Sequence, residues 1–443
     1  MTHWKLYTPG DTASWNLTRV VHLHRRTVFG ATAAEQRRDL TDDPQNVVSR
    51  ILNGTVRINT PPSFHELSDV IGNAAADSSN PDRLKAWWLY RCLFSPNPLQ
   101  ERLTLIWHNH FATSNLKINN LQQMKQQNET LRKHSRSPFG VLLNAMLRDP
   151  ALLVWLDAPV NRKGQPNENL ARELMELFTL GVGHYTETDV KETARALTGW
   201  TIRNGGFEQR PNLHDDGEKT ILNETGDWTG SDVADILLKQ PATAKRLAWR
   251  LTSECFGENV VSKDAIDELA AQLQSTELDI AAAVETILRS SLFFSDANIN
   301  SRICDPVSFM IGPLRTLDCA DPPPSTLMLA EWLRRMGQNL FYPPNVGGWN
   351  GGRTWLSTRT VIARTNYAAA LVSGQLHNPV RVPELSTLEG RGNDIGQVAK
   401  LVGVQCDSDA ARRISNEHQK LDGQEKMAAT IVSLLMLPEA HLH

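Results

Sequence analysis

No apolar stretch in the sequence is long enough to cross a membrane. A membrane-spanning helix needs roughly 20 consecutive apolar residues, whereas the most hydrophobic region, residues 141–156, is interrupted by Arg148, Asp149 and Pro150. We therefore expect no membrane insertion. Residues 1–30 also lack the charged start, apolar block and small-residue cleavage site of a secretory signal peptide. The chain as written is accordingly predicted to be cytoplasmic, and export would require that a leader is missing from the sequence as given.

Paired cysteine motifs are absent too. The five cysteines are scattered, and none forms C-x-x-C. An odd, scattered set argues against a disulfide framework and against a cysteine zinc site. We therefore expect reduced thiols, most of them buried. They are Cys92, Cys255, Cys304, Cys319 and Cys406.

The common nucleotide-binding and hydrolase signatures are missing as well. The sequence contains no G-x-x-x-x-G-K-[ST], G-x-G-x-x-G, H-E-x-x-H or G-x-S-x-G motif, which argues against nucleotide-dependent enzymes and serine hydrolases. Its 46 Lys and Arg against 49 Asp and Glu leave a formal net charge of -3. That balance gives no strong basic field, so we expect no nucleic-acid partner.

Helical periodicity is what the sequence does contain, together with a hydrophobic fraction of 40% and twelve Trp. Residues 83–94 and 99–111 each predict an amphipathic, Trp-bearing helix, and the Ser-Pro-Asn-Pro sequence of residues 95–98 predicts the turn between them. Residues 167–180 predict the clearest helix, with leucines at helical spacing and Asn167 as its N-cap. Residues 186–189 predict a capping-box start for the next helix.

Two long stretches interrupt the helical pattern, apart from the shorter turns and loops. Residues 199–228 are polar and Gly-rich, with a turn signal at residues 204–206, and they predict a small excursion of two or three β-strands. Residues 373–394 are rich in Pro, Gly and polar side chains and predict an exposed loop or linker. The predicted fold class is therefore mainly α: a multi-helix globular array in one large domain of residues 1–443, with a small β-hairpin excursion near residues 200–228.

The sequence Trp-His-Asn-His-Phe of residues 107–111 contains the first candidate site. His108 and His110 have the H-x-H spacing that is familiar among metal ligands. At the end of a helix, however, alternate residues point about 200° apart, so both bind one ion only if the helix ends between them. The alternative is that one histidine is hydrogen-bonded in the core and the other caps the helix.

The polar face of the helix over residues 167–180 is the second candidate. Glu168, Arg172 and Glu176 are spaced four residues apart, with Glu173 at the boundary of that face. Exposed to solvent, they would form a ladder of salt bridges. Buried between apolar helices, they would have perturbed pKa values and would indicate a catalytic site.

The third candidate is His214, Asp215 and Asp216 in the β excursion. A histidine beside two carboxylates suits hard-metal or acid–base chemistry. Asp-Asp-Gly is equally an ordinary turn sequence, so both interpretations stay open.

The fourth candidate is the Pro-Pro-Asn-Val-Gly-Gly-Trp loop of residues 343–349. Its glycines permit close backbone approach, and Trp349 and Trp355 are suited to form an apolar wall or stacking platform. A rigid loop packed on the core is the alternative.

These motifs resemble the bacterial domain of unknown function 1800 family. The matching stretches follow in order over most of residues 20–370, and residues 161–200 are the most specific. They are residues 26–32, 105–114, 152–182, 189–200, 214–220 and 336–352, and Asn366. The resemblance implies a protein partner encoded nearby, of a sulfatase-like family, and relatives that are commonly exported. It implies no reaction, substrate or cofactor.

Two functional hypotheses follow. In the first, the chain is a metal-dependent or acid–base enzyme with a divalent metal as cofactor, and Arg172 holds an anionic group. In the second, it is a non-catalytic binding or scaffold protein, whose polar motifs fix helix packing and whose Trp-bearing loop contacts a partner. Positions of the polar motifs distinguish the two, since only the first needs them in one pocket. The candidates are His108, His110, Glu168, Arg172, Glu173, Glu176, His214, Asp215 and Asp216.

Overall fold

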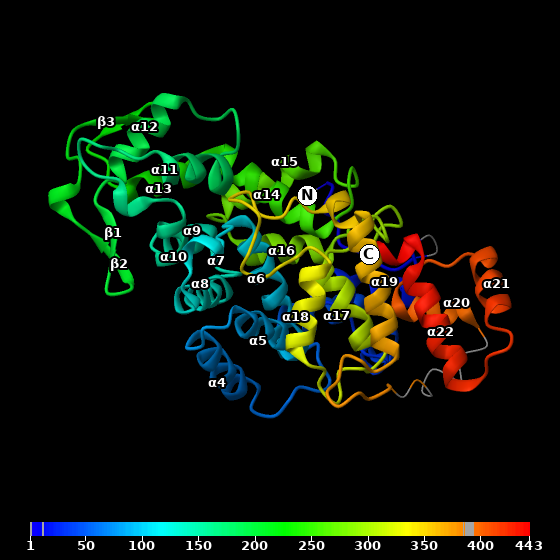
Figure 1. The fold of residues 1–443 in the computed structure, drawn as a ribbon. Helices are drawn as coiled ribbons and strands as arrows, with labels where there is room; N and C mark the ends of the chain where they lie inside the picture. The colour runs from blue at the N-terminus through cyan, green and yellow to red at the C-terminus, as the bar shows by residue number, and fades with distance from the viewer. Residues whose placement is uncertain (1, 11–12, 384, 386–393) are drawn as a thin grey trace.

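The computed structural model describes residues 2–10, 13–383, 385 and 394–443. Over these ranges the chain is mainly α-helical, and its strands form two short hairpins, which confirms the predicted fold class. Figure 1 shows the hairpins at one end of the molecule, with α20–α22 at the opposite end. In the described part of the chain, no helix is both long enough and apolar enough to span a bilayer.

The helices and strands follow one another in three groups. The first comprises α1 (Leu17–Val28), α2 (Ala33–Leu40), α3 (Pro44–Leu52), α4 (Phe64–Ala76), α5 (Pro81–Phe94), α6 (Pro98–His110), α7 (Asn115–Ile118), α8 (Leu121–Lys133), α9 (Phe139–Met146) and α10 (Pro150–Trp155). The second comprises α11 (Asn169–Glu173), η2 (Leu174–Thr179), α12 (Glu187–Ala196), β1 (Trp200–Arg203), β2 (Gly206–Gln209), β3 (Lys219–Ile221), β4 (Glu224–Gly226), α13 (Gly230–Lys239), α14 (Pro241–Cys255), α15 (Lys263–Ser275) and α16 (Ile280–Arg289). The third comprises α17 (Pro306–Thr316), α18 (Thr326–Arg335), η4 (Gly352–Leu356), α19 (Thr358–Val372), α20 (Ile395–Val402), α21 (Ser408–Glu417) and α22 (Gly423–Met436).

The two Trp-bearing helices α5 and α6 lie in the interior. Each begins with a proline after an asparagine N-cap, and the Asn97 side chain accepts a hydrogen bond from the Gln100 amide, so the predicted turn is confirmed. Both helices are buried on nearly all sides, and Trp88 and Trp107 are fully buried. The predicted amphipathic pattern is therefore wrong in this respect, because neighbouring helices cover the faces that were expected to meet water.

The predicted helix over residues 167–180 changes its hydrogen-bonding pattern midway. Asn167 Oδ1 accepts from the Asn169 amide at 3.0 Å, but the helix begins at Asn169 with Glu168 as its N-cap, so the predicted N-cap lies one residue too early. From Leu174 the chain continues as the π-helical turn η2, in which the Leu180 amide donates to the Met175 carbonyl at 2.8 Å. A π turn is a recurrent feature of functional sites, but helical periodicity does not reveal it.

The excursion of residues 199–228 has four strands, not two or three. β1 pairs with β2, and β3 pairs with β4, each as a two-stranded antiparallel hairpin. Asn204 and Gly205 both have positive φ in the first turn, as a tight hairpin requires. Thr186 and Asp189 form the predicted capping box at the start of α12, against which β3 packs.

The loop of residues 373–394 lies between α19 and α20. Its described residues form neither helix nor strand, but Leu376 and Leu385 are fully buried, so this part is not simply an exposed linker. Residues 384 and 386–393 of the predicted loop lie outside the described residues. The single-domain organisation stays a prediction.

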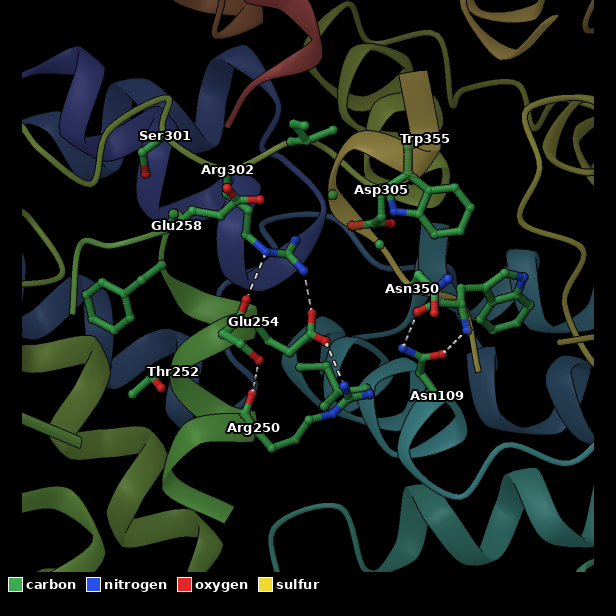
Figure 2. A pocket seen from close by; sticks show the side chains of 18 of the residues that line it. Asn109, Arg250, Thr252, Glu254, Glu258, Ser301, Arg302, Asp305, Asn350 and Trp355 are labelled. Carbon is green, nitrogen blue, oxygen red and sulfur yellow. Dashed lines mark hydrogen bonds and ion pairs between the residues drawn. The ribbon is translucent and has the colours of Figure 1, made fainter. Parts of the chain in front are cut away.

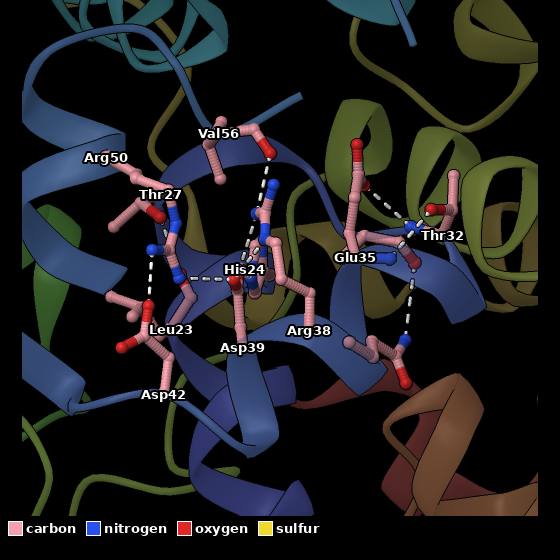
Figure 3. Close-up of polar contacts among 12 residues, drawn as sticks. Leu23, His24, Thr27, Thr32, Glu35, Arg38, Asp39, Asp42, Arg50 and Val56 are labelled. Atoms are coloured by element: carbon pink, nitrogen blue, oxygen red, sulfur yellow. Dashed lines mark hydrogen bonds and ion pairs between the residues drawn. The ribbon is translucent and has the colours of Figure 1, made fainter. Parts of the chain in front are cut away.

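Buried charges are paired where the N-terminal helices meet (Figure 3). Asp39 of α2 is fully buried and accepts hydrogen bonds from His24 at 2.8 Å, Arg38 at 2.6 Å and Arg50 at 2.7 Å. Burial opposes ionisation of Asp39, but the hydrogen bonds from His24 and Arg38 outweigh it and lower its pKa. The carboxylate therefore joins α1, α2 and α3 through charge-assisted hydrogen bonds.

Candidate ligand-binding cleft

A cleft of about 700 Å³ lies beside α6 and α14 and is bordered by the loop that leads into η4. Its walls combine tryptophans with charged and amide side chains (Figure 2). Ligand-binding pockets typically have volumes of about 300–1,000 Å³, so the size suits a small molecule. The residues that concern its chemistry are Arg102, Asn109, Trp249, Arg250, Glu254, Glu258, Asn259, Arg302, Asp305, Gln338, Trp349, Asn350, Arg353 and Trp355.

Asn109 fixes the tryptophan loop to the last turn of α6. Its Oδ1 accepts from the Trp349 amide at 2.7 Å, and its Nδ2 donates to the Trp349 carbonyl at 3.3 Å (Figure 2). This double hydrogen bond joins the first sequence motif to the fourth. It also determines where Trp349 stands in the cleft wall.

Gly348 makes this approach sterically feasible. Its φ is +78°, and a Cβ at this position would lie 2.2 Å from Asn109 Oδ1 and 2.6 Å from the Asn109 carbonyl oxygen. No side chain fits at such distances. Glycine is therefore required by both the backbone conformation and the contact with α6.

His108 lies beneath the loop in an aromatic cage. Its ring centroid is 5.1 Å from that of Trp88, 5.6 Å from that of Phe341 and 5.8 Å from that of Trp349. Both ring nitrogens are buried, and neither has a hydrogen-bond partner in the described structure. Burial lowers the His108 pKa to about 3, so the ring is neutral at physiological pH.

His110 points to a different group of residues. Its Nε2 lies 3.1 Å from the Phe178 carbonyl of η2, and its ring packs against Trp107, Phe111 and Phe139. Burial, with Arg250 and Arg246 nearby, lowers its pKa well below the ordinary value. The neutral ring can therefore donate a hydrogen bond from Nε2–H to the Phe178 carbonyl. This carbonyl lies at the end of the π-helical turn, where backbone acceptors lack partners within the helix.

Most of the deep charges of the cleft are paired with one another. Arg302 donates to Glu254 at 2.6 Å and to the Ser253 carbonyl at 3.1 Å, whereas Arg102 donates to Asp305 at 3.0 Å. Burial raises the pKa of Asp305, but Arg102 and Arg302 outweigh this effect and lower it overall. These charged side chains therefore bind one another within the cleft wall.

Arg250 is the exception among the deep cations. Its Nη1 is 3.8 Å from Glu254 Oε1, and its Nε and Nη2 are buried without a hydrogen-bond partner in the described structure. Burial lowers the pKa of this guanidinium, although Glu254 partly opposes the effect.

Four polar side chains at the solvent-exposed opening of the cleft, called its mouth below, have no partner among the described residues. Glu258 and Asn259 follow α14, Asn350 lies in the facing loop, and Arg353 lies in η4 directly after that loop; all four are exposed. A Cβ placed on Gly352 would be 3.6 Å from Glu258 Oε1, so the two segments are close. Within residues 2–10, 13–383, 385 and 394–443, none of these four side chains makes a hydrogen bond or ion pair.

The second sequence motif lies outside the cleft. Arg172 binds Glu187 through both guanidinium nitrogens, at 2.7 and 2.8 Å, and Glu168 at 3.1 Å. The Glu187 side chain is 68% exposed, so the outer part of this face is a salt-bridge network in contact with water.

Glu173 and Glu176 lie on the more buried part of the same face. Tyr185 donates to Glu176 at 2.6 Å, and burial together with this hydrogen bond raises the Tyr185 pKa to about 12. Glu173 is half-buried, and both burial and the Glu176 charge raise its pKa. Two carboxylates and a tyrosine therefore share one partly shielded position.

The side chains of the third motif contact neighbouring residues in the hairpin region. His214 Nδ1 lies 3.1 Å from the Thr198 carbonyl. Asp215 is held by Arg195 through contacts of 2.8 and 3.2 Å, which lower its pKa to about 2. Asp216 forms an exposed ion pair with Lys163.

The predicted candidates thus occupy separate environments. The histidines of α6 are caged by aromatic rings, Glu176 is hydrogen-bonded by Tyr185, and the hairpin residues pair locally; none of the candidates lines the cleft. In the described ranges, no three His, Cys, Asp or Glu side chains are arranged to hold a metal ion. Their catalytic and metal-binding roles stay predictions.

Sequence reasoning missed the residues that do line the cleft, apart from the two loop tryptophans. Asn109 lies between the two candidate histidines, and a polar residue in the last turn of a largely buried helix was the available signal. Glu258 and Arg353 have no local signal, because only tertiary packing brings their segments together.

Comparison with known proteins gives a family. No curated protein and no solved structure matches the chain. The model of one family, described as protein of unknown function (DUF1800), matches residues 22–442 of the 443. That range includes both segments of the cleft and every candidate motif. The chain therefore belongs to the DUF1800 family.

Proposed function

We propose that this protein binds a small polar ligand in the cleft between α14 and the loop of residues 342–353. The observation that carries the proposal is a cavity of about 700 Å³ in which unpaired polar side chains face tryptophan walls. Ligand sites combine apolar surface with a few convergent polar groups in this way. This is a form of the binding hypothesis, with the Trp-bearing loop as its recognition element.

The construction of the loop supports a preformed site. The clamp from Asn109 and the close approach of Gly348 fix Trp349 before any ligand arrives. Preorganisation lowers the entropic cost of binding, since the wall need not be ordered by the ligand. The deep ion pairs between Arg302 and Glu254 and between Arg102 and Asp305 keep the floor in place.

Ligand-observed NMR with a mixed fragment set tests this proposal. The set contains neutral polyols, carboxylates, phosphates and amines. We expect at least one class to bind the wild type and to lose binding in Asn350→Ala and Arg353→Ala, whose side chains are exposed and uncommitted. Arg359→Ala, an exposed residue of α19 outside the cleft, is the matched control. Failure of all classes to bind, or equal binding by all variants, would overturn the proposal.

Acid–base chemistry at Glu173 and Glu176 is a second candidate, favoured by the raised pKa of Glu173 beside a second carboxylate. Here Glu173 would exchange a proton with substrate, and Tyr185 would hold Glu176 in place. Chromogenic ester, phosphate and glycoside substrates, with and without added divalent metal, test it. Turnover lost in Glu173→Gln and kept in Glu187→Gln supports this candidate. No turnover by the wild type, or equal turnover by both variants, counts against it.

A further inference from the structure

The cleft wall combines indole side chains with hydrogen-bonding groups. Trp349 and Trp355 are each 7% exposed, and Trp249 is 42% exposed, all as lining residues. An indole face packs well against the C–H face of a saturated ring, while the polar substituents at that ring's edge remain free to hydrogen-bond. From this arrangement, we propose that the ligand of the cleft is a neutral carbohydrate. The inference rests on the function proposed above.

The charges of the cleft disfavour a strongly charged ligand. Arg302 and Arg102 are neutralised by Glu254 and Asp305 at 2.6 and 3.0 Å. A phosphate or a polycarboxylate would have to compete with these carboxylates for the same guanidinium groups and would be repelled by them. A buried ion pair that loses one partner is strongly destabilised, so the paired floor favours a ligand without net charge.

Arg250 does not change this conclusion. Its Nε and Nη2 are enclosed in protein, with essentially no exposed surface. An anion in the cleft therefore has no access to these two nitrogens. The guanidinium still adds positive charge to the cleft, and a hydroxyl oxygen can accept a hydrogen bond from the remaining part of the group.

The free polar groups of the mouth match hydroxyl chemistry. Glu258 offers acceptors, Arg353 offers donors, and the amides of Asn259 and Asn350 offer both. A hydroxyl both donates and accepts, so a ring with several hydroxyls can pair with each of these kinds of side chain. Glu258 and Arg353 also have opposite charges, so together they present no net charge to the ligand.

Gln338 supplies a further donor on the floor. Its Oε1 accepts from the Val307 amide at 3.1 Å, which fixes the side chain and leaves its amide hydrogens for a ligand. In the described residues this Nε2 makes no hydrogen bond, although the side chain is only 4% exposed and lines the cleft. The deep end of the cleft can therefore anchor one hydroxyl in a fixed orientation.

Isothermal titration and intrinsic tryptophan fluorescence test the proposal. The probes are glucose, galactose, mannose, N-acetylglucosamine and their β-1,4- and α-1,4-linked oligosaccharides, with glucuronate and inorganic phosphate as charged comparisons. We expect saturable binding of a neutral sugar, weakened at least tenfold in Glu258→Ala and in Asn350→Ala. Because both residues are exposed and uncommitted, these variants should fold normally. Arg359→Ala should bind like the wild type, and the affinity should be nearly unchanged between 50 mM and 500 mM salt.

The outcomes separate this inference from the proposed function. If phosphate or glucuronate binds in the cleft with a strong salt dependence and no neutral sugar does, the carbohydrate inference fails and the binding function stands. If neither the sugars nor any fragment class binds, both fail. Sugar binding that is unaffected by Glu258→Ala and Asn350→Ala places the sugar elsewhere and also overturns the inference.

Discussion

Asn109 holds both polar atoms of the Trp349 backbone, accepting from its amide at 2.7 Å and donating to its carbonyl at 3.3 Å. The two residues are 240 positions apart in the chain. One side chain thereby replaces the hydrogen bonds that a loop of this kind would otherwise make to water. It also connects the last turn of a central buried helix to the wall of the cleft.

Asn109→Asp should destabilise the protein by about 1–3 kcal/mol, because the new carboxylate oxygen faces the Trp349 carbonyl where a donor is required. The acceptor for the Trp349 amide is retained, so the substitution isolates the loss of the donor. Urea unfolding at pH 7 measures the effect, with Asn350→Asp as a control that should change stability by less than about 0.5 kcal/mol. Equal stability of Asn109→Asp and the wild type would show that the donor half of the clamp contributes nothing.

His108→Phe should be nearly neutral in stability at pH 7 and should reduce the loss of stability in acid. The folded-state pKa is lowered to about 3 from 6.5, so the unfolded chain binds the proton first. The contribution of the neutral ring is therefore fully present above pH 6.5 and is lost as the pH falls towards 3. One such group changes the unfolding free energy by at most about 1.4 kcal/mol per pH unit.

Urea unfolding between pH 7 and pH 4 checks this prediction. The unfolding free energy of His108→Phe should depend less steeply on pH than that of the wild type. The difference in slope should correspond to at most one proton taken up on unfolding. If the substitution instead removes a bound metal from the purified protein, the earlier H-x-H hypothesis is supported. An unchanged slope would mean that the ring is already accessible to protons in the folded state.

Asp39→Asn should cost about 3–5 kcal/mol, because it leaves Arg38 and Arg50 facing a neutral amide in a buried position. Asp42→Asn is the matched control: Asp42 contacts the same Arg50 at 2.5 Å, but its side chain is 31% exposed, so its loss should cost less than about 1 kcal/mol. Both are measured by denaturant unfolding at pH 7.

The pH dependence of Asp39→Asn has a defined sign. The pKa of Asp39 is lowered in the folded state, so its contribution is present above the ordinary value near 3.8 and is lost only as the pH falls below it. The stability deficit of the variant should therefore stay constant from pH 7 to pH 5 and shrink only in stronger acid. A deficit that varies over pH 5–7 would contradict this prediction.

Local signals predicted the helix boundaries but not the contacts between them. The Asn97–Pro98 start of α6 and the Thr186–Asp189 capping box are encoded within a few residues, so short-range chemistry was sufficient. The π turn that begins at Leu174 has no counterpart in the helical periodicity of the sequence.

The candidate site was harder to predict, because residue type is a poor guide to position. His214 and Asp215 have the chemistry of a site, yet their neighbours Thr198 and Arg195 take up their hydrogen bonds. Glu258 and Arg353 are ordinary surface residues in the sequence, and the fold alone places them on facing segments. The loop tryptophans do line the cleft, and their bulk and the adjacent glycines are local features that the sequence makes visible.

Glu173→Gln should stabilise the protein at pH 7, in contrast to the other carboxylate substitutions. Burial and the neighbouring Glu176 raise the Glu173 pKa in the folded state, so its contribution is fully present below the unfolded pKa near 4.5 and is lost as the pH rises through the folded value. The ionised form is therefore the less stable one, and glutamine removes that cost while keeping the shape of the side chain. The advantage of the variant should disappear below pH 4.5.

Glu187→Gln provides the comparison of opposite sign, because the hydrogen bonds from Arg172 lower the Glu187 pKa. That variant should be slightly less stable than the wild type at pH 7, with the difference shrinking as the pH falls. Unfolding curves of both variants from pH 7 to pH 4 should therefore change in opposite directions relative to the wild type. If Glu173→Gln is the less stable protein at pH 7, the Glu173 carboxylate is held by a cation such as Arg172, and a role as a proton-exchanging group is excluded.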